Sequence, residues 1–371
     1  MFSNSKGGFF MPLRARIKNQ DIISVDHSDD QWENLKKEIK KDKLMVYLSC
    51  CDGQGFLRTS KLGLKHFAHK KSENICDWKP ESPEHLWVKK AIVEGCITAG
   101  WNGVPEFTGD NWRADVLAFQ GNKKIAFEVQ WSPQTYQETK FRQERYKNSG
   151  VRGCWFFKKP SGKTRIDFDE LIHNQPIPTF ILQKDENQKI FSELNNRKIT
   201  ITELVANLLN GHVKFRENYE ILKGKLIAII FFDIKCWKCK RSQHLYTVPD
   251  HFSSTVKSTC GIPSEKFISF NGFELDFNST IINSVLDFSK TELGKNLKIG
   301  KIKNRYSRTV GESYLSHGCF YCDSIFGHHF MFNEKFDALY SKQSIQIQLS
   351  QNLKIKEAHW CFSKEFIFCS D

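Results

Sequence analysis

The sequence has no hydrophobic run that approaches the roughly 20 apolar residues that a helix needs to cross a membrane. Residues 1–7 lack the charged, then apolar, then small-residue order of a signal peptide. No internal repeat or low-complexity tract stands out. We therefore expect a soluble, cytoplasmic protein that neither enters a membrane nor is secreted.

Acidic residues are too few to balance the basic ones, since 42 Asp and Glu face 55 Lys and Arg, for a formal net charge of +13. The pI of the sequence is about 9.1. An excess of positive charge favours a polyanionic partner, and DNA is the partner that we expect. The alternative is a solvated basic surface, and charge alone does not separate the two.

At 371 residues the chain is long for a single hydrophobic core, so two or three domains are expected. A Ser-Pro-Glu helix start at residue 82 marks one boundary. A change to Lys-, Asn- and Glu-rich sequence near residue 184 marks another. We predict an N-terminal module at 1–79, a core domain at 80–183 and a C-terminal domain at 184–371.

The core domain alternates between helical and extended patterns. A helix is predicted from Ser82, its N-cap, and Pro83, its first residue, to Gly100, which ends it. The elements expected after it are a hairpin at 111–131, a charged helix at 135–148, and strands near 153–157 and 179–182. This order predicts an α/β (α+β) architecture with helices flanking a sheet.

Asp115 and Glu128 lie on the two strands of the hairpin. On the return strand the side chains alternate, so Glu128 and Gln130 share a face opposite Phe127 and Val129. A carboxylate beside an apolar core costs free energy unless it is paired or binds a cation. Two such acids on one hairpin indicate a divalent-metal site of the kind that nucleases use, the alternative being ordinary surface acids.

Short motifs follow one another through the core domain in a definite order. They are Glu81-Ser82-Pro83-Glu84-His85-Leu86 with Lys89, Arg113-Ala114-Asp115-Val116, Ile125-Ala126-Phe127-Glu128-Val129-Gln130 with Ser132-Pro133, and Arg142 with Tyr146, Gly150 and Trp155. Together they resemble the nuclease-like domain of the competence protein CoiA family, a branch of the PD-(D/E)XK nuclease superfamily. The resemblance covers roughly residues 45–160 and includes His66-Phe67-Ala68-His69-Lys70 in the N-terminal module.

This resemblance implies a restriction-endonuclease-like sheet flanked by helices. It also implies that Asp115 and Glu128 bind Mg²⁺ or Mn²⁺, with Glu84 assisting from the first helix. Hard cations prefer oxygen ligands, and such an ion lowers the pKa of an attacking water and neutralises charge on the scissile phosphate. Carboxylates suit that task.

The third motif position is Gln130, where the superfamily commonly has lysine, although glutamine is usual in the CoiA-like branch. Gln130 can orient a water or a phosphate but carries no charge. His85 and Lys89 are four residues apart on one helix face, and we expect them to contact substrate. Lys89 would supply the missing charge, unless it is an ordinary solvated helix lysine.

Arg142 and Tyr146 repeat the four-residue spacing on the later helix, and the resemblance implies that they face the active site. They are predicted to hold a phosphate or to brace the carboxylates. The alternative is an ordinary amphipathic helix with Tyr146 in the core. A further alternative is that the fold is retained while catalysis is lost.

Twelve cysteines in a chain without an export signal favour metal ligation or buried thiols over disulfides. Two Cys-x-x-Cys pairs, Cys236 with Cys239 and Cys319 with Cys322, are the donor set of a structural tetrahedral Zn²⁺ site. A redox role is the competing interpretation, but it gives no reason for two pairs. Lysines and Trp237 at the first pair suit nucleic-acid contact, and a purely structural clip is the alternative.

The N-terminal module holds further candidate zinc ligands, namely Cys50, Cys51, His66, His69 and Cys76. Proteins of the resembled family often have a Cys-x-x-Cys pair here. Adjacent cysteines do not easily bind one tetrahedral ion in a standard knuckle, so we favour a structural role for the two histidines or a place near the nuclease cleft.

Taken together, the sequence predicts a Mg²⁺- or Mn²⁺-dependent DNA nuclease with a structural zinc domain, acting in DNA uptake, recombination or defence. Two other functions stay open. One is a non-catalytic DNA-binding or processing factor that uses the same cleft. The other is an interaction adaptor whose zinc domain binds another protein.

Overall fold

The computed structural model describes residues 11–61, 63–70, 81–132, 134–159, 177–194, 197–249 and 275–362. The chain divides into two compact units, Met1–Lys214 and Phe215–Asp371, and each is considered by itself. No helix among the described residues is both long and apolar enough to span a membrane.

The N-terminal module of unit 1 is a small three-stranded sheet, order β2-β1-β3, with a separate hairpin of β4 and β5. Trp32 is buried at its centre and packs edge-on against Phe67, with ring centroids 5.2 Å apart. Ser28 begins the helix in a capping box with Gln31. The elements are β1 (Arg14–Ile17), β2 (Gln20–Ile23), η1 (Ser24–Asp26), α1 (Asp29–Lys41), β3 (Val46–Leu48), β4 (Gly55–Thr59) and β5 (Lys65–His69).

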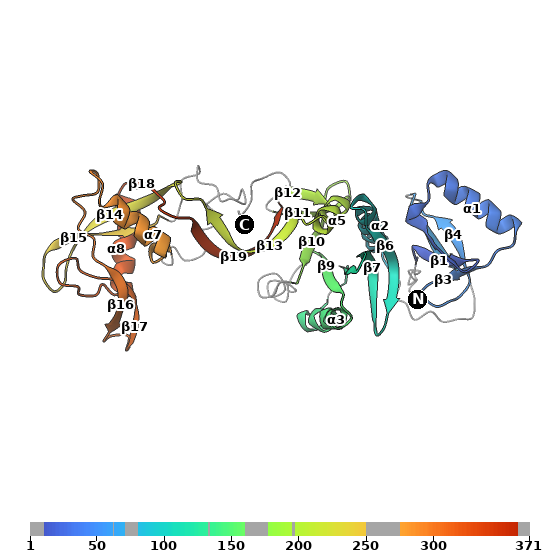
Figure 1. The fold of residues 1–371 in the computed structure, drawn as a ribbon, viewed down its shortest axis with the longest axis horizontal. Coiled ribbons are helices and arrows are strands. Elements are labelled where there is room, and N and C mark those ends of the chain that lie inside the picture. The colour runs from blue at the N-terminus through green and yellow to red at the C-terminus, as the bar shows by residue number, and fades with distance from the viewer. Residues whose placement is uncertain are drawn as a thin grey trace, which may run out of the picture. The chain divides into compact units, whose positions relative to one another are not determined.

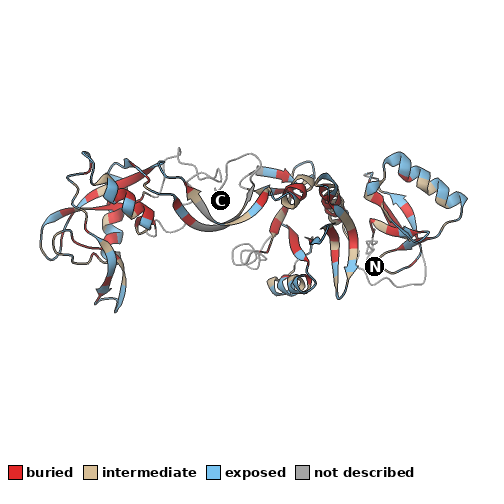
Figure 2. Cartoon of the chain, viewed as in Figure 1, coloured by how far each residue is buried: buried red, intermediate tan, exposed pale blue. Residues whose placement is uncertain are grey.

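A seven-stranded mixed sheet, order β12-β11-β10-β9-β8-β7-β6, forms the body of unit 1 (Figure 1). β9 pairs in parallel with β8 and β10, and the other neighbours are antiparallel. Both faces of the central strands are buried, as the red stretches in Figure 2 show. The strands are β6 (Asn102–Gly109), β7 (Trp112–Gln120), β8 (Lys123–Gln130), β9 (Arg152–Lys158), β10 (Thr179–Lys184), β11 (Ile190–Leu194) and β12 (Arg197–Thr200).

Three helices among the described residues accompany this sheet, and a hydroxyl side chain caps each of them. The side-chain oxygen of each cap accepts a hydrogen bond from the backbone amide three residues later, which the helix itself leaves unpaired. The caps are Ser82, Thr135 and Thr200. The helices are α2 (Pro83–Thr98), α3 (Tyr136–Asn148) and α5 (Ile201–Leu209). The predicted α/β (α+β) class, a core sheet with flanking helices, is confirmed.

The sheet continues beyond residue 183, where the sequence-based boundary lies. β11 and β12 extend it antiparallel to β10, and α5 packs on α2. The change in composition near residue 184 therefore reflects exposed turns between the last strands, and the division by contacts falls after Lys214.

Unit 2 is built around the apolar strand β14, which pairs antiparallel with β15 and β18. Its core gathers the aliphatic side chains of β14 with Tyr246 and Val285. This strand ends at Lys235, next to the first cysteine pair. The elements are β13 (Val213–Ile221), β14 (Leu226–Lys235), β15 (Ser242–Thr247), α7 (Ser279–Phe288), β16 (Ile302–Ser307), β17 (Glu312–His317), α8 (His328–Ser341), β18 (Ile345–Gln348) and β19 (Leu353–Phe362).

The close approach of α2 and α5 depends on Gly95. A Cβ built at Gly95 would lie 2.7 Å from Cβ of Val205 and 2.8 Å from the Thr202 carbonyl oxygen. Gly95→Ala should therefore destabilise the protein by about 1–3 kcal/mol, although alanine normally favours a helix by about 1 kcal/mol over glycine. Thermal or urea unfolding measures this, with Ile97→Ala at an exposed site of α2 as control. A stabilised Gly95→Ala variant would contradict the packing described.

Candidate active site

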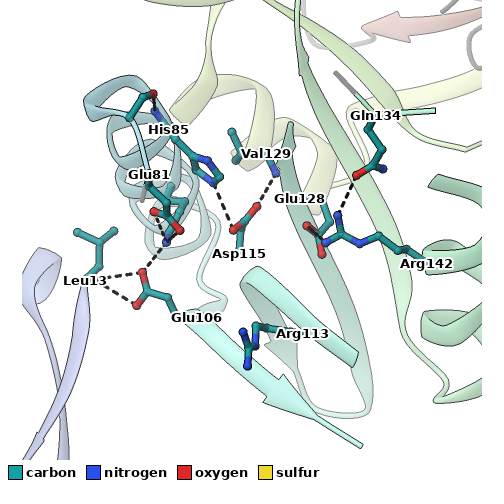
Figure 3. A network of polar contacts seen from close by, with 12 residues as sticks. Leu13, Glu81, His85, Glu106, Arg113, Asp115, Glu128, Val129, Gln134 and Arg142 are labelled. Carbon is teal, nitrogen blue, oxygen red and sulfur yellow. Dashed lines mark hydrogen bonds and ion pairs between the residues drawn. The ribbon is translucent and has the colours of Figure 1, made fainter. Parts of the chain in front are cut away.

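Asp115 lies in the middle of β7 and is held from two sides. Its Oδ2 accepts a hydrogen bond of 2.8 Å from the Val129 amide, which joins it to β8. Its Oδ1 lies 3.3 Å from Nε2 of His85, which projects from the first turn of α2. Figure 3 shows the carboxylate between the imidazole and the strand. Asp115, a predicted metal ligand, thus lies next to His85, which the sequence predicted separately as a substrate-binding residue.

Glu81, His85 and Asp115 present three ligand atoms that all lie within 4.8 Å of one another. Nε2 of His85 is buried and has no well-aligned hydrogen bond to any described residue. A buried imidazole nitrogen that faces two carboxylates is a donor set for a divalent cation. The residues present therefore fit a metal ion at this place.

The charges in this group shift its titration strongly. Burial opposes ionisation of His85, but Asp115 and then Glu81 outweigh it and raise its pKa. Burial alone would raise the pKa of Asp115, yet His85, Lys89 and the Val129 amide hold it below its ordinary range. Without a bound cation, the two carboxylates favour the protonated form of His85.

Glu128 on β8 is buried and both of its oxygens have partners. Oε2 accepts a hydrogen bond of 2.5 Å from Nη2 of Arg142, and Oε1 is contacted by the Tyr146 hydroxyl. Burial, and next the charge of Asp115, raise the pKa of Glu128 to about 8, although Arg142 and Tyr146 partly oppose this. The pKa of Glu128 is thus raised, whereas the pKa of the neighbouring Asp115 is lowered.

Arg142 and Tyr146 come from one face of α3, as the four-residue spacing predicted. Arg142 also donates to Oε1 of Gln134 at 3.1 Å, and its guanidinium lies 5.0 Å from the Trp155 ring centroid. Tyr146 is buried and donates to the Arg113 carbonyl at 2.5 Å. Both residues therefore brace Glu128, and Tyr146 is at the same time part of the core.

Lys89 is not a solvated lysine, and its amino group does not face open solvent. It is fully buried, with Nζ 3.0 Å from Oε2 of Glu81 and 2.5 Å from Oε1 of Glu106. Burial would lower the pKa of Lys89, but Glu106 and Glu81 outweigh that effect and raise it. The expectation that Lys89 contacts phosphate is therefore replaced by an internal role.

Glu84 lies apart from the group around Asp115. Its Oε1 is 2.7 Å from Nζ of Lys184 on β10, and both side chains line a cavity with Trp87. Glu81, one turn earlier, occupies the place expected for Glu84. Gln130 is half-buried at the end of β8, two residues after Glu128 and on the same side of the strand.

Two acids of this region were missed by the sequence analysis as functional residues. Glu81 was part of a quoted motif, but it precedes the helix cap. The helical pattern therefore did not predict the direction of its side chain. Glu106 has a positive φ of 48° and accepts hydrogen bonds from the amides of Leu13 and Arg14 at 3.1 Å. Nothing in the local sequence around Glu106 predicts a contact with residues so distant in the chain.

In unit 2 the four predicted cysteines come together. Sγ of Cys236 lies 3.7 Å from that of Cys322, and Sγ of Cys239 lies 3.7 Å from that of Cys319. All four sulfurs are within 4.8 Å of one another. Thiolates 2.3 Å from a tetrahedral zinc ion are about 3.8 Å apart, so the cluster has the dimensions of a Cys₄ zinc site.

The N-terminal candidates separate into two sets. Cys50, Cys51 and His69 form a group of close ligand atoms, whereas Nδ1 of the buried His66 is 3.0 Å from the Leu64 carbonyl. Cys76 lies outside the described residues.

Comparison with known proteins defines the class of the core domain. Residues 81–221 match the family model described as "Competence protein CoiA, nuclease-like domain". This part of the chain is a nuclease-like domain. The match agrees with the resemblance of the motifs to the CoiA-like family.

Two other comparisons add little. No curated protein matches the chain. A solved structure of Pyrococcus furiosus SfsA in complex with Ca²⁺ aligns with 43% of this chain and 87% of its own, at 12% identity and a TM-score of 0.22. A TM-score that low carries no argument about the site.

Replacing Lys89 tests the internal role of its amino group. Lys89→Met leaves Glu81 and Glu106 without their cation and should lower the free energy of unfolding by about 3–5 kcal/mol. Urea unfolding measures this loss. Lys90→Met, which removes a more exposed lysine paired with Glu94, is the control and should cost under about 1 kcal/mol. Equal losses in both variants would contradict the assigned role.

The raised pKa of Glu128 predicts a pH dependence of stability. Between its ordinary pKa of 4.5 and about 8, the folded protein binds more protons at Glu128 than the unfolded chain does. Stability from this group is therefore lost as pH rises through that window, at up to about 1.4 kcal/mol per pH unit.

Glu128→Gln has no such proton and should gain stability relative to the wild type from pH 5 to pH 8. Melting temperatures of the metal-free proteins measure it, with the exposed Glu144→Gln as control on α3. A constant difference between Glu128→Gln and wild type across this range would show that the pKa is not raised.

Proposed function

We propose that this protein is a divalent-metal-dependent nuclease that hydrolyses phosphodiester bonds in DNA. The observation that carries the proposal is the half-buried group of Glu81, His85 and Asp115 beside the buried Glu128, within a CoiA nuclease-like domain. The strongly basic chain, with a net charge of +13, supports a polyanionic substrate. DNA uptake, recombination or defence are the settings that we expect for it.

Asp115, His85 and Glu81 would hold the ion. Two carboxylates with one imidazole suit Mn²⁺ better than Mg²⁺, which prefers oxygen ligands throughout. When bound, the ion would make an attacking water more acidic and neutralise charge on the scissile phosphate.

The chain's own residues around Glu128 prepare the proton transfer. Arg142 and Tyr146 fix both carboxylate oxygens, so the group cannot rotate away. A carboxylate whose pKa lies near neutrality is suited to accept a proton from water. Gln130, on the same side of β8, is placed to orient that water or the phosphate.

The cysteine cluster of unit 2 would bind one structural Zn²⁺. Trp237, between the first two cysteines, is 56% exposed, and lysines at 235, 238 and 240 lie close to it in the sequence. An exposed aromatic ring among cations is suited to stack on a base of DNA. We assign this knuckle to substrate contact as well as to structure.

A non-catalytic DNA-binding factor is the second candidate. The observation that favours it is the complete pairing of Glu128, whose two oxygens already contact Arg142 and Tyr146. In that case the cleft would bind DNA without cutting it.

The cleavage test compares a substitution in the candidate metal group with one at an acid outside it. Wild-type protein with Mn²⁺ should cut DNA, and Asp115→Asn should reduce the rate at least about 100-fold while DNA binding persists. Glu84→Gln, which loses only the ion pair with Lys184, should keep the rate within about threefold. A rate that survives in Asp115→Asn would refute the site, and binding without cutting by the wild type would favour the second candidate.

The zinc assignment has its own test. Cys236→Ser combined with Cys319→Ser should remove one Zn²⁺ per chain, because a site left with two thiolates binds the ion weakly. Elemental analysis of the purified chain measures it. Unchanged zinc in this double variant would defeat the assignment.

A further inference from the structure

The turn after β3 brings two adjacent cysteines against the end of β5. Sγ of Cys50 lies 3.5 Å from Nε2 of His69, and Sγ of Cys51 lies 3.3 Å from the same nitrogen. The two sulfurs are 3.6 Å apart. The turn and β5 thus bring three ligand atoms within 4.8 Å of one another.

These distances are those of donors around one small tetrahedral ion. With zinc–sulfur bonds of about 2.3 Å and a zinc–nitrogen bond of about 2.0 Å, sulfurs are about 3.8 Å apart and sulfur to nitrogen is about 3.5 Å. The three measured separations agree with these values within about 0.3 Å. The adjacent cysteines therefore can share one ion, contrary to the sequence-based expectation.

The backbone around the group leaves room for the sulfurs. A Cβ at Gly53 would lie 3.1 Å from Sγ of Cys51. A side chain at position 53 would therefore crowd this sulfur.

We propose that Cys50, Cys51 and His69 bind a Zn²⁺ ion, separate from the Cys₄ cluster of unit 2. Two thiolates and an imidazole are donors that zinc prefers and that Mg²⁺ does not. The ion would fasten the β3–β4 turn to β5 in a module whose core is small, where a metal adds stability that few buried side chains supply. On binding, the two thiols release their protons and His69 binds through neutral Nε2.

Zinc content of the full-length chain tests this proposal without disturbing the N-terminal module. The wild type should contain two Zn²⁺ per chain, and Cys236→Ser with Cys319→Ser should retain one. If that double variant contains no Zn²⁺, the proposal is wrong. If it still contains two Zn²⁺ per chain, the Cys₄ assignment is wrong instead.

Substitution at the proposed ligands gives the complementary result. Cys50→Ser with Cys51→Ser should lower zinc by one per chain, and Cys96→Ala, which removes a buried thiol elsewhere in unit 1, should lower it by none. Equal zinc in both variants would overturn the proposal.

Because the Cys50 and Cys51 variant could fail to fold, Co²⁺ provides a measurement on the intact module. In the Cys236→Ser, Cys319→Ser background, added Co²⁺ should give the strong visible absorption of a tetrahedral site and a sulfur-to-cobalt band in the near ultraviolet. Weak octahedral absorption alone, or a disulfide joining Cys50 and Cys51 in protein purified without reductant, would contradict the proposal.

Discussion

The amino group of Lys89 connects the parts of unit 1 that make the site. It is fully buried between Glu81, a member of the candidate metal group, and Glu106, on the edge strand β6. A buried charge is tolerated only when it is paired, so the three side chains fix one another. The position of Glu81 near Asp115, and with it the donor set, depends on this lysine.

Glu106 extends the network into the N-terminal module. Its carboxylate accepts the amides of Leu13 and Arg14, and Arg14 returns a hydrogen bond of 2.9 Å to the Glu106 carbonyl. Figure 3 shows this path from Leu13 through Glu106 toward Glu81. Polar contacts near the candidate site therefore join the N-terminal module to the nuclease-like core.

The sequence predicted well what local pattern determines. The helix cap at Ser82, the helix near 135–148, the alternation along β8 and the four-residue spacing of Arg142 and Tyr146 each depend on near neighbours. It failed where distant segments decide. The partner of Glu84 is Lys184, a hundred residues away, and the burial of Lys89 depends on Glu106. The contact of Cys50 and Cys51 with His69 likewise depends on β5, a separate strand that places the histidine beside them.

We propose that a divalent cation binds at Asp115 with His85 and Glu81 as further ligands. Crystals of the full chain with Mn²⁺, measured at the manganese absorption edge, give the sharpest test. We expect an anomalous peak within about 2.5 Å of ligand atoms of both Asp115 and His85. A peak beside Glu84 and Lys184, or no peak at Asp115 in a well-ordered site, would contradict it.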